Sequence, residues 1–189
     1  LTYLYFKYSM MKKFISLLLM LCLFNMHVFA QKTFDKHPNT SGKGWSNLFN
    51  DSITNAIYPQ GVWSITDGVI TASKDEALWS EKEYDNFILD LEFKNAPGTN
   101  SGVIVHATET KEWIPHSVEI QIADDYSEEW SKATPSWQCA AIFGHQPATK
   151  RTVKPAGEWN QAEIIANNGK LDFFLNGVNV VSTTMWDDN

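Results

Sequence analysis

The segment from Asn100 to Asp124 brings together residue types that are able to carry out acid–base chemistry. Strand side chains alternate between two faces, so the run VEIQI places Glu119 and Gln121 on one side and its three aliphatic residues on the other. The preceding run, VIVHA, brings His106 to one face of a neighbouring strand by the same rule. A carboxylate, a carboxamide and an imidazole on adjacent strands predict a polar site on an otherwise apolar sandwich.

Each of these three side chains has a chemical role and a plainer alternative. His106 is a candidate base because an unperturbed imidazole titrates near pH 6.5; a surface or hydrogen-bonded core histidine is the alternative. Glu119 could act as a second base, an acid or a metal ligand, or could lie on a solvated strand face. Gln121 can orient a ligand hydroxyl through its paired donor and acceptor, or can be a simple exterior polar residue.

Four further residues are candidates for ligand contact. Asn100 and Ser101 begin a strand after a Pro-Gly turn, where turn capping would explain them equally well. Glu92 shares the polar face of its own strand, with solvation as the alternative. His145 stands where an apolar run opens into a loop, a favourable place for binding residues.

A divalent metal is a further possibility that the sequence leaves open. His106, Glu119, Glu92 and His145 are suitable ligand types for a transition metal, which could act as a Lewis acid. No closely spaced histidine pair of the HxH or HExxH kind accompanies them. Strand alternation alone cannot establish zinc-ligand distances of about 2.0–2.2 Å.

The first thirty residues have the layout of a secretory signal peptide. Met11–Lys13 is a basic start, Phe14–Phe24 is an apolar run, and Ala30 offers a small residue for cleavage. An N-terminal membrane anchor is the alternative, although the apolar run is short for a span of about 20 residues. We expect a secreted or periplasmic protein, with residues 1–9 as a candidate non-native extension before the initiator methionine.

Cleavage after Ala30 would leave 12 basic and 22 acidic residues, a net charge of −10. Such a balance argues against nucleic acid as a partner, because phosphates demand a basic surface. The remaining chain carries no second long apolar run, so stable membrane insertion is not expected. Cys139 would be its single cysteine, which excludes an intrachain disulfide and favours a buried structural thiol.

The rest of the chain reads as a flexible leader, residues 31–44, followed by one β-sandwich domain, residues 45–189. Asp67-Gly68 and Asn176-Gly177 each separate two alternating runs, a pattern typical of tight hairpins. Many short strands with turn residues between them predict an all-β fold. The chain stops soon after a strand, so we expect a closing C-terminal segment to be missing. The other expected elements are strands at Phe87–Lys94, Cys139–Phe143 and Gln161–Ala166, and one or two helical turns at Tyr126–Lys132.

Eight short motifs in a fixed order carry a family resemblance over about Gly44 to Val181. In this order and spacing, the chain resembles the 3-keto-disaccharide hydrolase domain family. The resemblance implies a concanavalin-like jelly-roll sandwich that binds sugar on its concave face and cleaves glycosides oxidised at the third carbon. The motifs are GWSNLFN, DGVI, YDNFILDLEFK, NSGVIVH, SVEIQIADDY, QCAAIFG, KPAGEWN and LNGVNVV.

The implied substrate gives the loop tryptophans a role. Trp113, Trp130 and Trp137 lie in or beside loops near the expected site and could stack on sugar rings, with Trp113 and Trp137 preferred. The chain departs from the family by lacking its usual C-terminal stretch, which contains Gly and His and ends in a final strand.

Three other accounts compete with an exported enzyme that acts on 3-keto-glycosides. A non-catalytic carbohydrate-binding module could use the same sandwich, and a structural or partner-binding domain needs no site at all. An ordinary retaining glycosidase would need two carboxyl groups about 5–5.5 Å apart, and only Glu119 is well placed. The polar residue types favour the enzyme, because simple binding does not require both a carboxylate and an imidazole.

Overall fold

The computed structural model of the protein describes residues 2–5 and 42–185, and its elements are almost all strands. One α-helical turn, α1 (Glu128–Ser131), and two short 3₁₀ turns, at Ile114–His116 and Pro135–Trp137, accompany them. The expected all-β class is confirmed. The strands are β1 (Thr2–Tyr5), β2 (Ala56–Ile57), β3 (Trp63–Thr66), β4 (Val69–Ala72), β5 (Trp79–Ser80), β6 (Phe87–Asn95), β7 (Asn100–Val105), β8 (Val118–Ala123), β9 (Trp159–Asn167), β10 (Lys170–Leu175) and β11 (Val178–Thr184).

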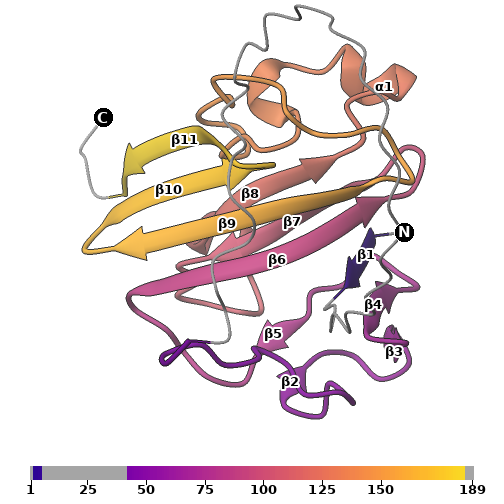
Figure 1. The fold of residues 1–189 in the computed structure, drawn as a ribbon, viewed down its shortest axis with the longest axis vertical. Coiled ribbons are helices and arrows are strands. Elements are labelled where there is room, and N and C mark those ends of the chain that lie inside the picture. Colours follow the sequence, from indigo (N-terminus) through magenta and orange to yellow (C-terminus); the bar gives the residue numbers. More distant parts are fainter. Residues whose placement is uncertain (1, 6–41, 186–189) are drawn as a thin grey trace, which may run out of the picture.

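The strands form two packed layers, as Figure 1 shows. The larger layer is a seven-stranded antiparallel sheet in the order β11-β10-β9-β6-β1-β4-β3. The β7–β8 pair lies behind it, and the short β2–β5 pair lies at the end of the molecule near β3 and β4. This arrangement confirms the jelly-roll sandwich expected from the family resemblance.

The core fills the space between the large sheet and the β7–β8 pair. Alternation along β6 turns Leu91 and Phe93 inward, and the partner residues on β9 and β10 follow the same two-residue period. From the opposite layer, Ile120 and Ile122 of β8 complete the contact. The main large-sheet contributors beyond β6 are Ala162, Ile164, Ala166, Leu171, Phe173 and Leu175.

Both predicted hairpins are confirmed with the expected turn geometry. Asp67 and Gly68 have φ angles of 51° and 76°, and Asn176 and Gly177 have φ angles of 52° and 78°. Two successive positive φ angles are what a type I′ turn requires. The turns therefore join β3 to β4 and β10 to β11 without splaying the strands.

The segment Cys139–Phe143, which we expected to be a strand, is not one. It runs beside β8 and exchanges backbone hydrogen bonds with it, but it forms only isolated bridges, from Ile142 to Ile120 and to Gln146. Ala140 has a φ angle of 71°, which interrupts the extended conformation that a ladder needs. The Cys139 thiol is buried, as expected, and burial raises its pKa to about 12.

Strand β1 occupies a place that the sequence did not predict. Thr2–Tyr5 lies between β4 and β6, antiparallel to both, with Leu4 in register with Ile70 and Phe93. Residues 6–41, which include the cleavage site and most of the leader, lie outside the described residues, so the signal peptide stays a prediction. Within the described residues, no helix is long and apolar enough to cross a membrane.

The neighbouring residues Phe173 and Phe174 provide a test of the layer assignment. Phe173 is 2% exposed in the core, whereas Phe174 points away from it and is only half-buried. We expect Phe173→Ala to lower the free energy of unfolding by about 3–5 kcal/mol, the usual cost of truncating a core phenylalanine. Phe174→Ala should cost clearly less in the same denaturant titration. Equal losses would contradict the assigned faces of β10.

Candidate functional site

The candidate site lies on the face of the β7–β8 pair that is turned away from the core. Ile120 and Ile122 face the core, so the alternating residues Glu119 and Gln121 point to the opposite side. This confirms the alternation predicted for VEIQI. On β7, Ile104 is the register partner of Glu119 and Gly102 that of Gln121.

The Glu119 side chain folds over the neighbouring strand at Gly102. A Cβ atom at Gly102 would lie 2.6 Å from Cγ and 2.8 Å from Cδ of Glu119, and closer still to Oε1. Such separations leave no room for a side chain at position 102 unless the Glu119 side chain moves. A glycine within a strand often marks a close approach of this kind, and that signal was present in the sequence.

Two effects raise the pKa of the Glu119 carboxyl group. Burial is the larger, because removal from water disfavours the charged form, and the negative charge of Asp75 is the second. Asp75 belongs to the exposed loop between β4 and β5, and the sequence analysis did not select it. A carboxyl group that holds its proton to higher pH than usual is suited to proton transfer near neutrality.

Gln121 is held rigidly beside Glu119. Its side chain is only 1% exposed, and Nε2 donates a hydrogen bond of 3.1 Å to Asn100 Oδ1. Its backbone N–H donates to Ala141 O at 2.9 Å and its carbonyl accepts from Ala140 N at 2.8 Å. Within the described part of the chain, Oε1 is buried without a hydrogen-bond partner. Because this atom has almost no accessible surface, a ligand can reach it only if the residues that cover it move.

Two aromatic pairs involve Trp137 and Trp113, the tryptophans predicted to stack on sugar. Trp137 is 48% exposed and packs on Phe143 with the ring centroids 5.2 Å apart. Phe143 N donates a hydrogen bond of 2.9 Å to the backbone carbonyl of Glu119, so the backbone that carries this aromatic pair runs beside that of Glu119. Trp113, in the loop between β7 and β8, meets the edge of Trp79 with centroids 6.4 Å apart.

Trp130, which we expected near the loops of the site, belongs to the core instead. It is 7% exposed in α1, and the single helical turn presses its ring into the apolar cluster.

His106 does not reach the site by strand alternation, contrary to expectation. Strand β7 ends at Val105, and His106 adopts a φ angle of 53°, which takes it out of the extended ladder. It is half-buried and directly follows the Val105–Val118 pair. His106 therefore lies near the end of the site, and strand geometry does not fix the direction of its imidazole.

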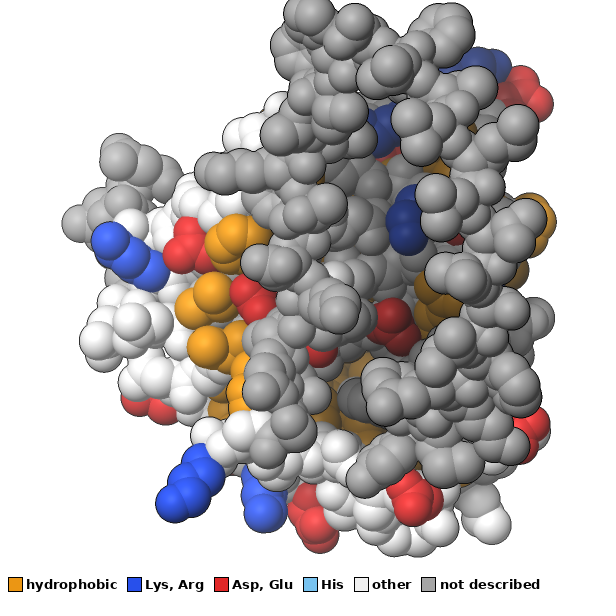
Figure 2. All heavy atoms as spheres, in the orientation of Figure 1, with side chains coloured by type: hydrophobic (Ala, Val, Ile, Leu, Met, Phe, Trp, Pro, Cys, Tyr) orange, Lys and Arg blue, Asp and Glu red, His pale blue; other side chains and the backbone are white. Residues whose placement is uncertain are grey.

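The structure separates Glu92 from Glu119. Leu91 and Phe93 face the core, so Glu92 lies on the outer face of the large sheet. Glu119 lies on the outer face of the other layer, so the two carboxylates are on opposite sides of the sandwich. Figure 2 views the outer face of the large sheet, where acidic and apolar side chains lie close together.

The other three predicted binding residues lie in different places: one at the site, one on the opposite face of β7 and one in a turn. Asn100 begins β7 and joins the site through Gln121. Ser101 is in register with Ile122, and alternation therefore turns it away from Glu119. His145 is exposed in the turn that follows Phe143, at the margin of the site.

The predicted metal ligands do not converge. Among residues 2–5 and 42–185, no three His, Cys, Asp or Glu side chains lie so that they could hold a metal ion. Separation of Glu92 from Glu119 by the thickness of the sandwich is one reason.

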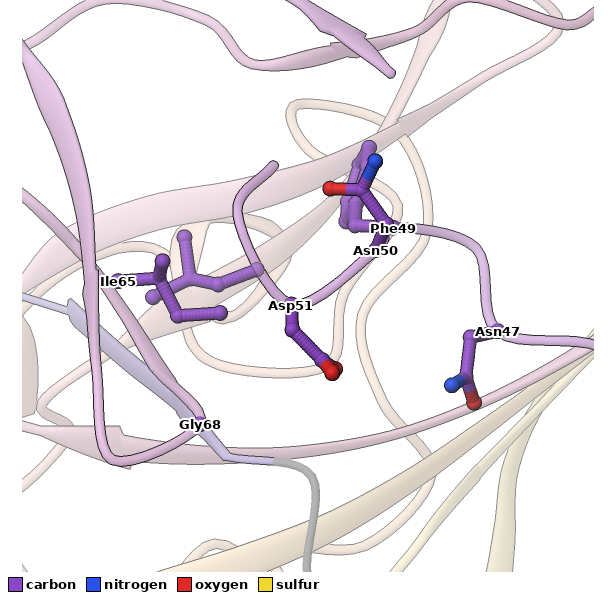
Figure 3. Close-up of a pocket in the computed structure, with 7 residues that line it drawn as sticks. Asn47, Phe49, Asn50, Asp51, Ile65 and Gly68 are labelled. Atoms are coloured by element: carbon purple, nitrogen blue, oxygen red, sulfur yellow. The ribbon is translucent and has the colours of Figure 1, made fainter. Parts of the chain in front are cut away.

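A shallow pocket elsewhere contains none of the predicted site residues. Its volume is about 60 Å³, and it lies between the segment at Asn47–Asp51 and the β3–β4 hairpin (Figure 3). Pockets that bind small molecules usually measure about 300–1,000 Å³, so this one is too small for a sugar. Its lining residues are Asn47, Phe49, Asn50, Asp51, Ile65, Gly68 and Ile70.

The fold agrees with what comparison with known proteins shows. The chain belongs to the family of 3-keto-alpha-glucoside-1,2-lyase-like domains, whose model matches residues 44–189. It is 26% identical to a 3-keto-disaccharide hydrolase of Bacteroides thetaiotaomicron, an alignment that covers 84% of this chain. The chain spans 58% of the length of that relative. The family resemblance seen in the sequence is thereby confirmed.

Solved structures of two proteins from Parabacteroides distasonis ATCC 8503 are also similar, each named as a candidate glycosyl hydrolase. The first is 49% identical with a TM-score of 0.72, covering 74% of this chain and 72% of its own. The second is 24% identical with a TM-score of 0.67, covering 75% and 72% respectively, and it supports the fold alone.

The raised pKa of Glu119 makes a pH-dependent stability difference testable. The folded state holds this proton more tightly than the unfolded chain, so the parent loses stability as pH rises above the ordinary value of 4.5. A glutamine at this position has no such loss. We expect Glu119→Gln to melt at a higher temperature than the parent at pH 7, with the gap narrowing towards pH 4.5. The exposed-loop control Glu83→Gln should follow the parent, and a gap independent of pH would contradict the prediction.

Proposed function

We propose that the chain is the catalytic domain of an exported enzyme that cleaves 3-keto-glycosides by elimination followed by hydration. The observation that carries the proposal is the half-buried Glu119 carboxyl group of raised pKa beside the buried Gln121. Membership of the lyase-like family and similarity to a 3-keto-disaccharide hydrolase support the substrate class. Export rests on the predicted signal peptide.

The ketone at C3 makes such a reaction accessible to a single base. Removal of the C2 proton leaves a carbanion that delocalises into the carbonyl as an enolate. The electron pair then expels the oxygen substituent at C1, which takes up a proton, and a C1=C2 double bond forms. Addition of hydroxide to C1 and a proton to C2 gives the free 3-keto sugar, so the net result is hydrolysis.

The described residues can be assigned roles in this sequence of steps. Glu119 would accept the C2 proton, because its raised pKa makes it a stronger base than an ordinary carboxylate. Asn100, which is exposed at the start of β7, would hold sugar hydroxyls, and the buried Gln121 would orient it through the hydrogen bond from Nε2 to Asn100 Oδ1. Trp137 and Trp113 would pack against the rings on either side. His106, at the end of β7, is the candidate for protonating the departing oxygen.

A carbohydrate-binding module is the second candidate function. The exposed Trp137–Phe143 pair is the observation that favours it, because an accessible aromatic surface is sufficient to bind a sugar ring. The two proposals differ in what they require of Glu119. A binding module has no use for a carboxyl group whose pKa is raised.

A comparison of two substrates separates the proposals. The parent protein should cleave a 3-keto-glucoside and leave the otherwise identical unoxidised glucoside intact. Glu119→Gln should lower kcat by about 10²–10⁴-fold, the usual contribution of a general base. Parallel assays with and without a chelator test the metal possibility. Equal cleavage of both glucosides would refute the carbonyl-assisted route, and sugar binding without turnover would favour the binding module.

The charge of Asp75 gives a second test through the pH profile. Asp75 raises the pKa of Glu119, so removal of its charge should lower that pKa. A base must be deprotonated to act, so Asp75→Asn should move the acidic limb of the kcat/KM profile to lower pH. Glu76→Gln removes the same charge from the adjacent position and should leave the limb in place. Identical profiles for parent and Asp75→Asn would exclude this electrostatic role.

A further inference from the structure

We infer that Gly102 is a positioning residue for the Glu119 carboxylate: the missing side chain on β7 forms the notch in which that carboxylate lies. The inference rests on the proposed function for its catalytic consequence, but not for its structural content. It assigns a purpose to a glycine that stands inside a regular strand.

Turn geometry does not account for this glycine. Most of the other glycines in the described residues have positive φ angles and lie at turns, where glycine relieves backbone strain. Gly102 is not among those positive-φ glycines, and it lies within the unbroken β7–β8 ladder, between Ser101 and Val103. A glycine in the interior of a strand is unfavourable, because it loses more conformational freedom and has no side chain to pack. Its presence therefore needs a local reason.

The local reason is the path of the Glu119 side chain. Glu119 is in register with Ile104, yet its Cγ, Cδ and Oε1 all lie over Gly102. The side chain therefore leans along the strand towards Gln121, the register partner of Gly102. The notch holds the carboxylate close to the buried carboxamide rather than in open water.

An alanine at position 102 would move the carboxylate without destroying the fold. The Cβ atom would overlap three atoms of Glu119, and all three belong to a flexible side chain that can rotate away. Neither the backbone ladder nor the core contacts of Ile120 need to change. The carboxylate would turn towards solvent, and both its distance from the substrate and its protonation would alter.

The decisive experiment measures the Glu119 carboxyl pKa and the kinetics in a double-mutant cycle. Gly102→Ala, Glu119→Ala and the double variant are compared with the parent protein. The pKa of the Glu119 carboxyl group is followed by carbon-detected NMR, with Glu119→Ala identifying its signal. Steady-state kinetics on a 3-keto-glucoside give kcat and KM separately.

We expect Gly102→Ala to lower the Glu119 pKa towards its ordinary value, because the carboxylate becomes more exposed to water. We expect kcat to fall about 10²-fold, the usual effect of misplacing a reacting group by about 1 Å, while KM changes little. In the Glu119→Ala background the same glycine substitution should have no further effect on kcat, since nothing remains to be displaced.

An unchanged Glu119 pKa in Gly102→Ala would overturn the inference. So would an equal loss of kcat in the presence and absence of the Glu119 side chain, which would indicate a general disturbance of β7. If the parent protein cleaves no 3-keto-glucoside, the proposed function fails. The NMR measurement still decides whether Gly102 positions the carboxylate.

Discussion

The apolar layer between the two sheets determines where every polar side chain of the site can lie. Phe93 from the large sheet and Ile120 from β8 are both essentially inaccessible to solvent. Since successive strand residues point to opposite faces, burial of Ile120 forces Glu119 and Gln121 onto the outer side of the sandwich. A one-residue slip of β8 would bury a carboxylate in the core and expose isoleucines. The register that stabilises the fold is therefore also the register that builds the site.

The buried carboxyl group of Asp125 and the half-buried one of Glu119 have very different surroundings. Asp125 accepts a hydrogen bond of 2.8 Å from Cys139 N and lies 3.5 Å from Nε of Arg151, so its charge is compensated even though burial raises its pKa. In the described part of the chain, Glu119 has no cation within ion-pairing distance, and the charge that acts on it is a second acid, Asp75. The first arrangement stabilises a loop. The second raises the free energy of the charged form of the Glu119 carboxyl group, a property that is common among groups that transfer protons.

The parts of the fold that local pattern controls could be predicted from the sequence. The alternation of Phe87–Lys94, the Asp-Gly and Asn-Gly turns and the outward face of Glu119 all follow from two-residue periodicity and turn chemistry. What failed depended on single backbone angles or on distant segments. A left-handed φ angle takes His106 out of the strand, another at Ala140 interrupts an apparent strand, and Asp75 meets Glu119 only through the folding of a remote loop.

In the chain that retains its first residues, strand β1 has a consequence for the order in which the large sheet can assemble; cleavage after Ala30 would remove this strand. Strands β9, β10 and β11 follow one another along the chain and pair with near neighbours, whereas Tyr3 pairs with Thr71 and Lys94. Closing such long loops lowers the conformational entropy of the chain before the stabilising contacts have formed, and this slows folding. The β9–β11 meander can therefore form early, and the junction between β6 and β4 must be completed late. The sheet is continuous in space, but the pairings of β1 with β4 and β6 are the last that we expect to form.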